Sequence, residues 1–114
     1  MSYKEFTLRS KSPEDASTEI MYEIASSRAD GVDLIRINVA YSLSDSENAD
    51  YKKSMKSIIR LLKSMKQKGS IQFFATADSF RLGTTEAIFL QNKYPSLLPH
   101  GIEEDSFTFI FVKI

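Results

Sequence analysis

The sequence contains no cysteine and a single histidine, His100, so the side chains that most often hold transition metals are almost missing. Without cysteine there is no disulfide framework and no thiolate metal site, and one histidine cannot form a histidine-rich centre. The four glycines are isolated from one another, which excludes the glycine-rich phosphate loops of nucleotide-binding folds. We therefore expect neither a metal nor a cofactor.

Long hydrophobic runs are also missing, because no apolar stretch approaches the roughly 18 residues that cross a bilayer. The first five residues lack the apolar core of a secretory signal. We expect no membrane partner, and a cytoplasmic location is the default. The 114 residues suffice for a single α/β domain over 1–114 with its own hydrophobic core.

Net charge is zero, with fifteen basic and fifteen acidic residues, so there is no global attraction to polyanions. The charge is nevertheless segregated, because residues 51–69 hold seven cations and no acid. The cations on one side of the helix predicted there are Lys52, Lys56, Arg60 and Lys63. This row has the spacing to follow the phosphates of a nucleic acid. The alternative is a solvated helix face, and no aromatic lies among these cations to stack on bases.

Hydrophobic patterning predicts the secondary structure. Runs of β-branched, aliphatic and aromatic residues predict strands at about 4–9, 32–41, 71–77 and 107–114. Ser12 and Pro13 are typical of a helix start, and further helices are predicted at about 47–68 and 85–93, with a loop over 78–83.

The predicted order is therefore βαβαβαβ in two or three layers. Helix-length connections favour parallel neighbouring strands with right-handed crossovers. We expect a mostly parallel four-stranded sheet, in which strands 4–9, 32–41 and 71–77 lie side by side and point the same way.

Ligands of parallel sheets collect outside the carboxyl ends of the strands, which makes the residues there candidates for binding. The residues at those ends combine a cation, hydroxyls and a carboxylate: Arg9, Ser10, Tyr41, Ser42, Thr76, Asp78 and Ser79. They suit a small polar or phosphate ligand. The alternative is that the serines are turn residues and that Asp78 satisfies free backbone N–H groups.

Arg36 and Asn38 are polar residues on one face of a predicted strand that is otherwise apolar. Such a pair can line a site, because buried polar groups need partners. The alternative, which we favour, places it at a margin of the sheet or beside Asp33 or Glu23.

The first third of the chain resembles the Smr (small MutS-related) domain. Residues 6–10, Phe-Thr-Leu-Arg-Ser, and residues 14–16, Glu-Asp-Ala, have the spacing of that family's Leu-Asp-Leu-His/Arg-Gly and Glu-Glu-Ala motifs. The strands at 71–74 and 108–112 parallel its later strands. The resemblance implies a compact α/β module that contacts nucleic acid.

The family's second strand ends in His-Gly-x-Gly, whose glycines let the backbone approach phosphate. This chain has Asn38-Val39-Ala40-Tyr41-Ser42 there, with neither histidine nor glycine. The resemblance therefore implies a relative without the nuclease residues.

Three hypotheses of function follow. The first is a non-catalytic binding or regulatory module of Smr-like topology that contacts nucleic acid through the basic helix. The second is a homo-oligomeric interaction protein, because the run Phe107–Ile114 is apolar on both faces and too hydrophobic for an exposed edge strand. The third is a small-ligand protein or an enzyme built on the strand ends, and no general base is evident there for catalysis.

Overall fold

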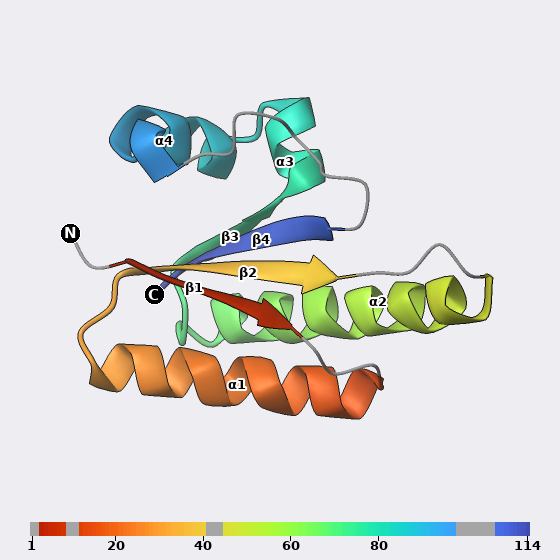
Figure 1. Cartoon of the computed structure of the whole chain (residues 1–114). Helices are drawn as coiled ribbons and strands as arrows, with labels where there is room; N and C mark the ends of the chain where they lie inside the picture. The colour runs from red at the N-terminus through yellow and green to blue at the C-terminus, as the bar shows by residue number, and fades with distance from the viewer. Residues whose placement is uncertain (1–2, 9–11, 41–44, 98–106) are drawn as a thin grey trace.

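The structure is a computed structural model that describes residues 3–8, 12–40, 45–97 and 107–114. The element order is β1, α1, β2, α2, β3, α3, α4, a short 3-10 helix at Pro95–Leu97, and β4. A four-stranded sheet is the middle of three layers, with α1 and α2 on one face and α3 and α4 on the other (Figure 1). The predicted α/β class is confirmed.

Helix α1 (Pro13–Ala29) begins where the sequence predicts a helix start. The Ser12 hydroxyl accepts the backbone N–H of Asp15 at 3.1 Å, and Pro13 occupies the first turn. Gly31 follows the helix with a φ of 74°, a conformation that glycine adopts without steric cost. The helix buries Ile20 and Ile24 against the sheet.

The order of strands across the sheet is β1-β2-β4-β3. β1 (Tyr3–Leu8) pairs in parallel with β2 (Leu34–Ala40), whereas β4 (Phe107–Lys113) is antiparallel to both β2 and β3 (Phe73–Thr76). β1, β2 and β3 therefore run in the same direction, but β3 is not beside β2. The expected mostly parallel sheet was wrong, because two of the three pairings are antiparallel.

The position of β4 follows from its side chains. Phe109 and Phe111 are buried on one face of the sheet, and Ile110 and Val112 are buried on the other. A strand that is apolar on both faces is most stable in the middle of a sheet covered by helices on both sides. Since both edges of β4 are paired within the chain, the argument for a homo-oligomer through Phe107–Ile114 loses its basis.

The chain does not form the expected loop over 78–83, because α3 (Ala77–Leu82) occupies most of it. The side chains of Thr76 and Ser79 cap the first turn reciprocally, and Gly83 ends the helix in the left-handed region. Six residues are too few for an apolar periodicity to become visible. The next helix, α4 (Thr85–Lys93), has its predicted bounds and its predicted cap at Thr84.

Helix α2 (Asp45–Gln67) lies beside α1 and packs Ile58 and Leu62 into the core on that side of the sheet. Leu90 of α4 belongs to a second core on the opposite face. Within the described residues, no helix is both long and apolar enough to cross a membrane.

Candidate functional site

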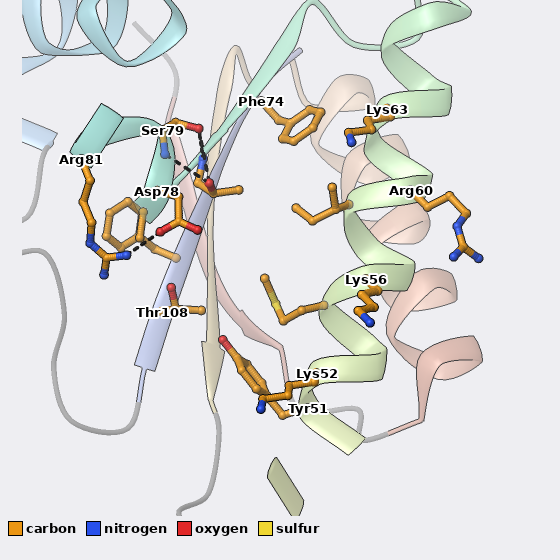
Figure 2. Close-up of a pocket in the computed structure, with 15 residues that line it drawn as sticks. Tyr51, Lys52, Lys56, Arg60, Lys63, Phe74, Asp78, Ser79, Arg81 and Thr108 are labelled. Carbon is orange, nitrogen blue, oxygen red and sulfur yellow. Dashed lines mark hydrogen bonds and ion pairs between the residues drawn. The ribbon is translucent and has the colours of Figure 1, made fainter. Parts of the chain in front are cut away.

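A groove of about 800 Å³ lies between α2 and the end of β3, where the chain turns into α3 (Figure 2). Residues of α2 form one side, residues of β3 and α3 form the other, and the start of β4 adds Thr108 and Phe109. The groove therefore lies at the carboxyl end of β3, one of the strand ends that the sequence singles out. The rule for ligands of parallel sheets does not apply to it, because β3 pairs only with the antiparallel β4.

The floor of the groove is apolar. Tyr51, Met55 and Ile59 follow each other at four-residue spacing, which places them along one line of α2. Phe74 of β3 adds a second aromatic ring. All four side chains are half-buried, since they pack against the core below and keep part of their surface in the groove.

The rim on the α2 side is cationic. Lys52, Lys56, Arg60 and Lys63 line the groove and are exposed, and Figure 2 shows them spaced along the helix. Among the described residues, no carboxylate forms an ion pair with any of them. Among the residues that the structure describes, the positive charge of this rim is therefore not paired with a carboxylate.

The opposite rim is polar, but its groups bind one another. The backbone N–H of Thr76 donates to Ser79 Oγ at 3.0 Å, and the N–H of Ser79 donates to Thr76 Oγ1 at 3.3 Å. Asp78 accepts a hydrogen bond from Arg81 at 2.5 Å. These side chains cap and brace α3, which agrees with the interpretation of Ser79 as a turn residue. The carboxylate of Asp78 pairs with Arg81, whereas the alternative from the sequence gave it free backbone N–H groups as partners.

The structure brings together two sets of residues that the sequence leaves separate. The predicted strand-end residues Thr76, Asp78 and Ser79 line the same groove as the predicted basic row, and Figure 2 shows Asp78 and Ser79 on the side opposite α2. The other predicted strand-end residues, Arg9, Ser10, Tyr41 and Ser42, lie outside the described residues.

Sequence reasoning missed the apolar floor as part of a site. The helical spacing of Tyr51, Met55 and Ile59 is typical of a core-facing stripe, and these residues do contact the core. The available signal was their position in the helix, because each precedes a cation by one residue: Lys52, Lys56 and Arg60. Two stripes that touch on a helix surface supply both the floor and the rim of a groove.

Arg36 and Asn38 belong to a different part of the fold. They lie on the sheet face that carries α3 and α4, where Arg36 Nε donates to Asn38 Oδ1 at 2.8 Å and Asn38 Nδ2 donates to Glu5 Oε1 at 2.7 Å. The guanidinium of Arg36 also stands 5.1 Å from the ring centroid of Phe109. The expected carboxylate partners, Asp33 or Glu23, were wrong, because Glu5 of the neighbouring strand takes this role.

Tyr3 extends the same network on β1. Its hydroxyl donates to Glu5 Oε2 at 3.2 Å. Burial, reinforced by the charge of Glu5, raises the pKa of the Tyr3 phenol from 10.0 to about 12. The polar groups of this network satisfy one another, so we assign it to the stability of the sheet.

Within the described residues, no three histidine, cysteine or carboxylate side chains gather closely enough to hold a metal ion. Comparisons with models of protein families, with curated proteins and with solved structures find no significant match to this chain. The site must therefore be interpreted from its own geometry and charge.

Proposed function

We propose that this chain is a non-catalytic binding module, of Smr-like topology, that contacts nucleic acid through the groove beside α2. The observation that supports this proposal is the row Lys52, Lys56, Arg60 and Lys63, exposed and free of ion pairs with described acids, along one rim of a groove. Cations arranged in a row bind phosphates with displacement of counterions, which is the main source of affinity in most nucleic-acid complexes.

Binding is favoured over catalysis by the state of the other polar groups in the groove. A hydrolytic site needs a nucleophile beside a base, or a carboxylate that is able to move a proton. Ser79 is bonded to Thr76, and Asp78 is paired with Arg81. Among the described lining residues, these groups brace α3 and leave no such pair.

The test is a titration of labelled RNA and DNA oligonucleotides, single-stranded and duplex, followed by fluorescence anisotropy at about 50 mM salt. We expect binding to at least one of them, and we expect Lys56→Glu/Arg60→Glu to remove it. The matched control is Lys53→Glu/Lys68→Glu, which reverses the same charge at exposed cations outside the groove.

Two results contradict the proposal. One is the absence of binding to every oligonucleotide at low salt. The other is an equal loss of affinity in the groove variant and in the control variant, because this shows that net charge alone matters. Folding of both variants is checked by circular dichroism, and it should be retained because all four cations are exposed.

The volume of the groove favours a second candidate, a small anionic ligand with an apolar body. About 800 Å³ lies within the range of small-molecule sites, and an apolar floor with a few charged groups is their usual lining. A competition experiment distinguishes the nucleic-acid module from the small-ligand site. A mononucleotide at millimolar concentration should displace the oligonucleotide fully only if one nucleotide is the whole ligand of the groove. Displacement that requires several linked nucleotides supports the nucleic-acid module.

A further inference from the structure

We infer that the groove selects single strands over duplexes, with bases inserted against Tyr51 and Phe74 while the cations of α2 hold the phosphates. This inference rests on the proposed function and adds the form of nucleic acid that the site accepts. It comes from the juxtaposition of two stripes on α2, one apolar and one cationic, whose residues line the same groove.

Single strands and duplexes offer different chemical groups to such a groove. In a nucleotide, the base and the phosphate are joined through one sugar, so an unpaired strand presents an apolar face and a charge side by side. A duplex keeps its base faces stacked and presents mainly phosphates to a protein surface. The half-buried floor of Met55 and Ile59 would gain no contact from a duplex that touches the rim.

Two half-buried aromatic rings line the groove. Tyr51 lies near one end of the groove, and Phe74 lies near the other, across from Lys63 (Figure 2). Base stacking on aromatic side chains is the common, sequence-tolerant way to bind single strands, and it acts together with a cationic groove that follows the backbone. Both parts of that arrangement are present here, because Tyr51 of α2 and Phe74 of β3 supply the rings and the cations of α2 supply the charge.

The length of the cationic row limits the number of nucleotides that it contacts. Lys52 and Lys63 are eleven residues apart, so the row extends about 16 Å along α2 at the rise of an α-helix. One strand of a duplex places a phosphate about every 3.4 Å along its axis, and an unpaired strand is free to extend beyond that. The row therefore matches a few successive nucleotides, which is the lower part of the range for single-strand sites.

The experiment compares a single strand of about 12 nucleotides with the duplex of the same sequence, at equal salt, by fluorescence anisotropy. We expect the single strand to bind at least about tenfold more tightly. The ring variants are Tyr51→Leu and Phe74→Leu, which remove an aromatic face and keep apolar bulk against the core. Each should weaken single-strand binding about 5- to 150-fold and leave duplex binding unchanged.

A second measurement needs no variant. The chain has five tyrosines and no tryptophan, so tyrosine emission is directly visible. A base stacked on Tyr51 should quench part of this emission on addition of an unlabelled single strand, whereas the duplex should not. This keeps the inference testable if a ring variant fails to fold.

The outcomes separate the inference from the proposed function. If duplex binds as tightly as single strand, or the ring variants bind normally while Lys56→Glu/Arg60→Glu does not bind, the inference is overturned and the proposed function stands. If no oligonucleotide binds at low salt, both fail. Selective binding of the single strand, with loss in the ring variants and quenching of tyrosine, supports the inference.

Discussion

The number of phosphates that the groove neutralises is measurable from the salt dependence of binding. For a single strand, the logarithm of the binding constant falls with the logarithm of salt concentration with a slope of about −0.7 for each phosphate neutralised. Contacts from Lys52, Lys56, Arg60 and Lys63 should therefore give a slope of about −2.8. Between about 50 and 200 mM salt, this is a loss of affinity of roughly 50-fold.

The perturbation is Lys56→Ala/Arg60→Ala, which removes the two central cations of the row. The slope should fall to about −1.4, and the same change of salt should then cost roughly 7-fold in affinity. Alanine is preferable to glutamate here because it removes contacts without adding repulsion. Both side chains are exposed, and alanine favours helix, so the free energy of unfolding should change by less than about 0.5 kcal/mol.

The assay is a set of anisotropy titrations over a series of salt concentrations, with one single-stranded oligonucleotide throughout. The control is Lys53→Ala/Lys68→Ala, at exposed cations that do not line the groove. An unchanged slope in the Lys56/Arg60 variant would refute the reasoning, since those side chains would not be touching phosphate. An equal change of slope in the control variant would also refute the reasoning, because the slope would then depend on the net charge of the protein and not on contacts in the groove.

Three further predictions concern the fold. Ile110→Ala should lower the free energy of unfolding by about 2–5 kcal/mol in urea denaturation, because Ile110 is completely buried on β4, one of the two inner strands, and a loss below about 1 kcal/mol would contradict that position. Thr84→Ala should lower it by about 1 kcal/mol, since the Thr84 hydroxyl accepts the Ala87 N–H at 3.3 Å, whereas Thr84→Ser should change it little. Stability should fall as pH rises from 10.0 towards about 12, because the phenol of Tyr3 ionises in the unfolded chain before it ionises in the folded one. Tyr3→Phe should flatten this part of the pH profile, and an unaltered profile would show that Tyr3 is not its cause.

The secondary structure was largely predictable, because its signals lie in neighbouring residues. Ser12 and Pro13 start α1 through contacts within one turn, and Thr84 caps α4 in the same way. The strands lie within a few residues of their predicted positions, since alternation or a short apolar run is itself local. The exception is α3, whose signal is a reciprocal cap between Thr76 and Ser79 that has no hydrophobic pattern beside it.

The candidate site was predictable only in pieces. The basic row and the strand-end residues were each found, because helical spacing and strand ends are visible in the sequence. That these two sets of residues line one groove was not predictable from the sequence. Thr76 and Lys56 come together only because β3 occupies the edge of the sheet beside α2. The same holds for Asn38, whose partner Glu5 is 33 residues away and becomes adjacent through strand pairing.

The sequence by itself determined where helices and strands form and which faces of them are apolar or cationic. Tertiary structure decided the direction and place of β4, and with them which surfaces face each other. The physical reason is that a local pattern sets the conformation of a segment, whereas the order of strands depends on which pairing buries most apolar surface across the whole chain. Because β4 is buried on both faces, it lies inside the sheet between β2 and β3. This leaves β3 at the edge, where the groove forms.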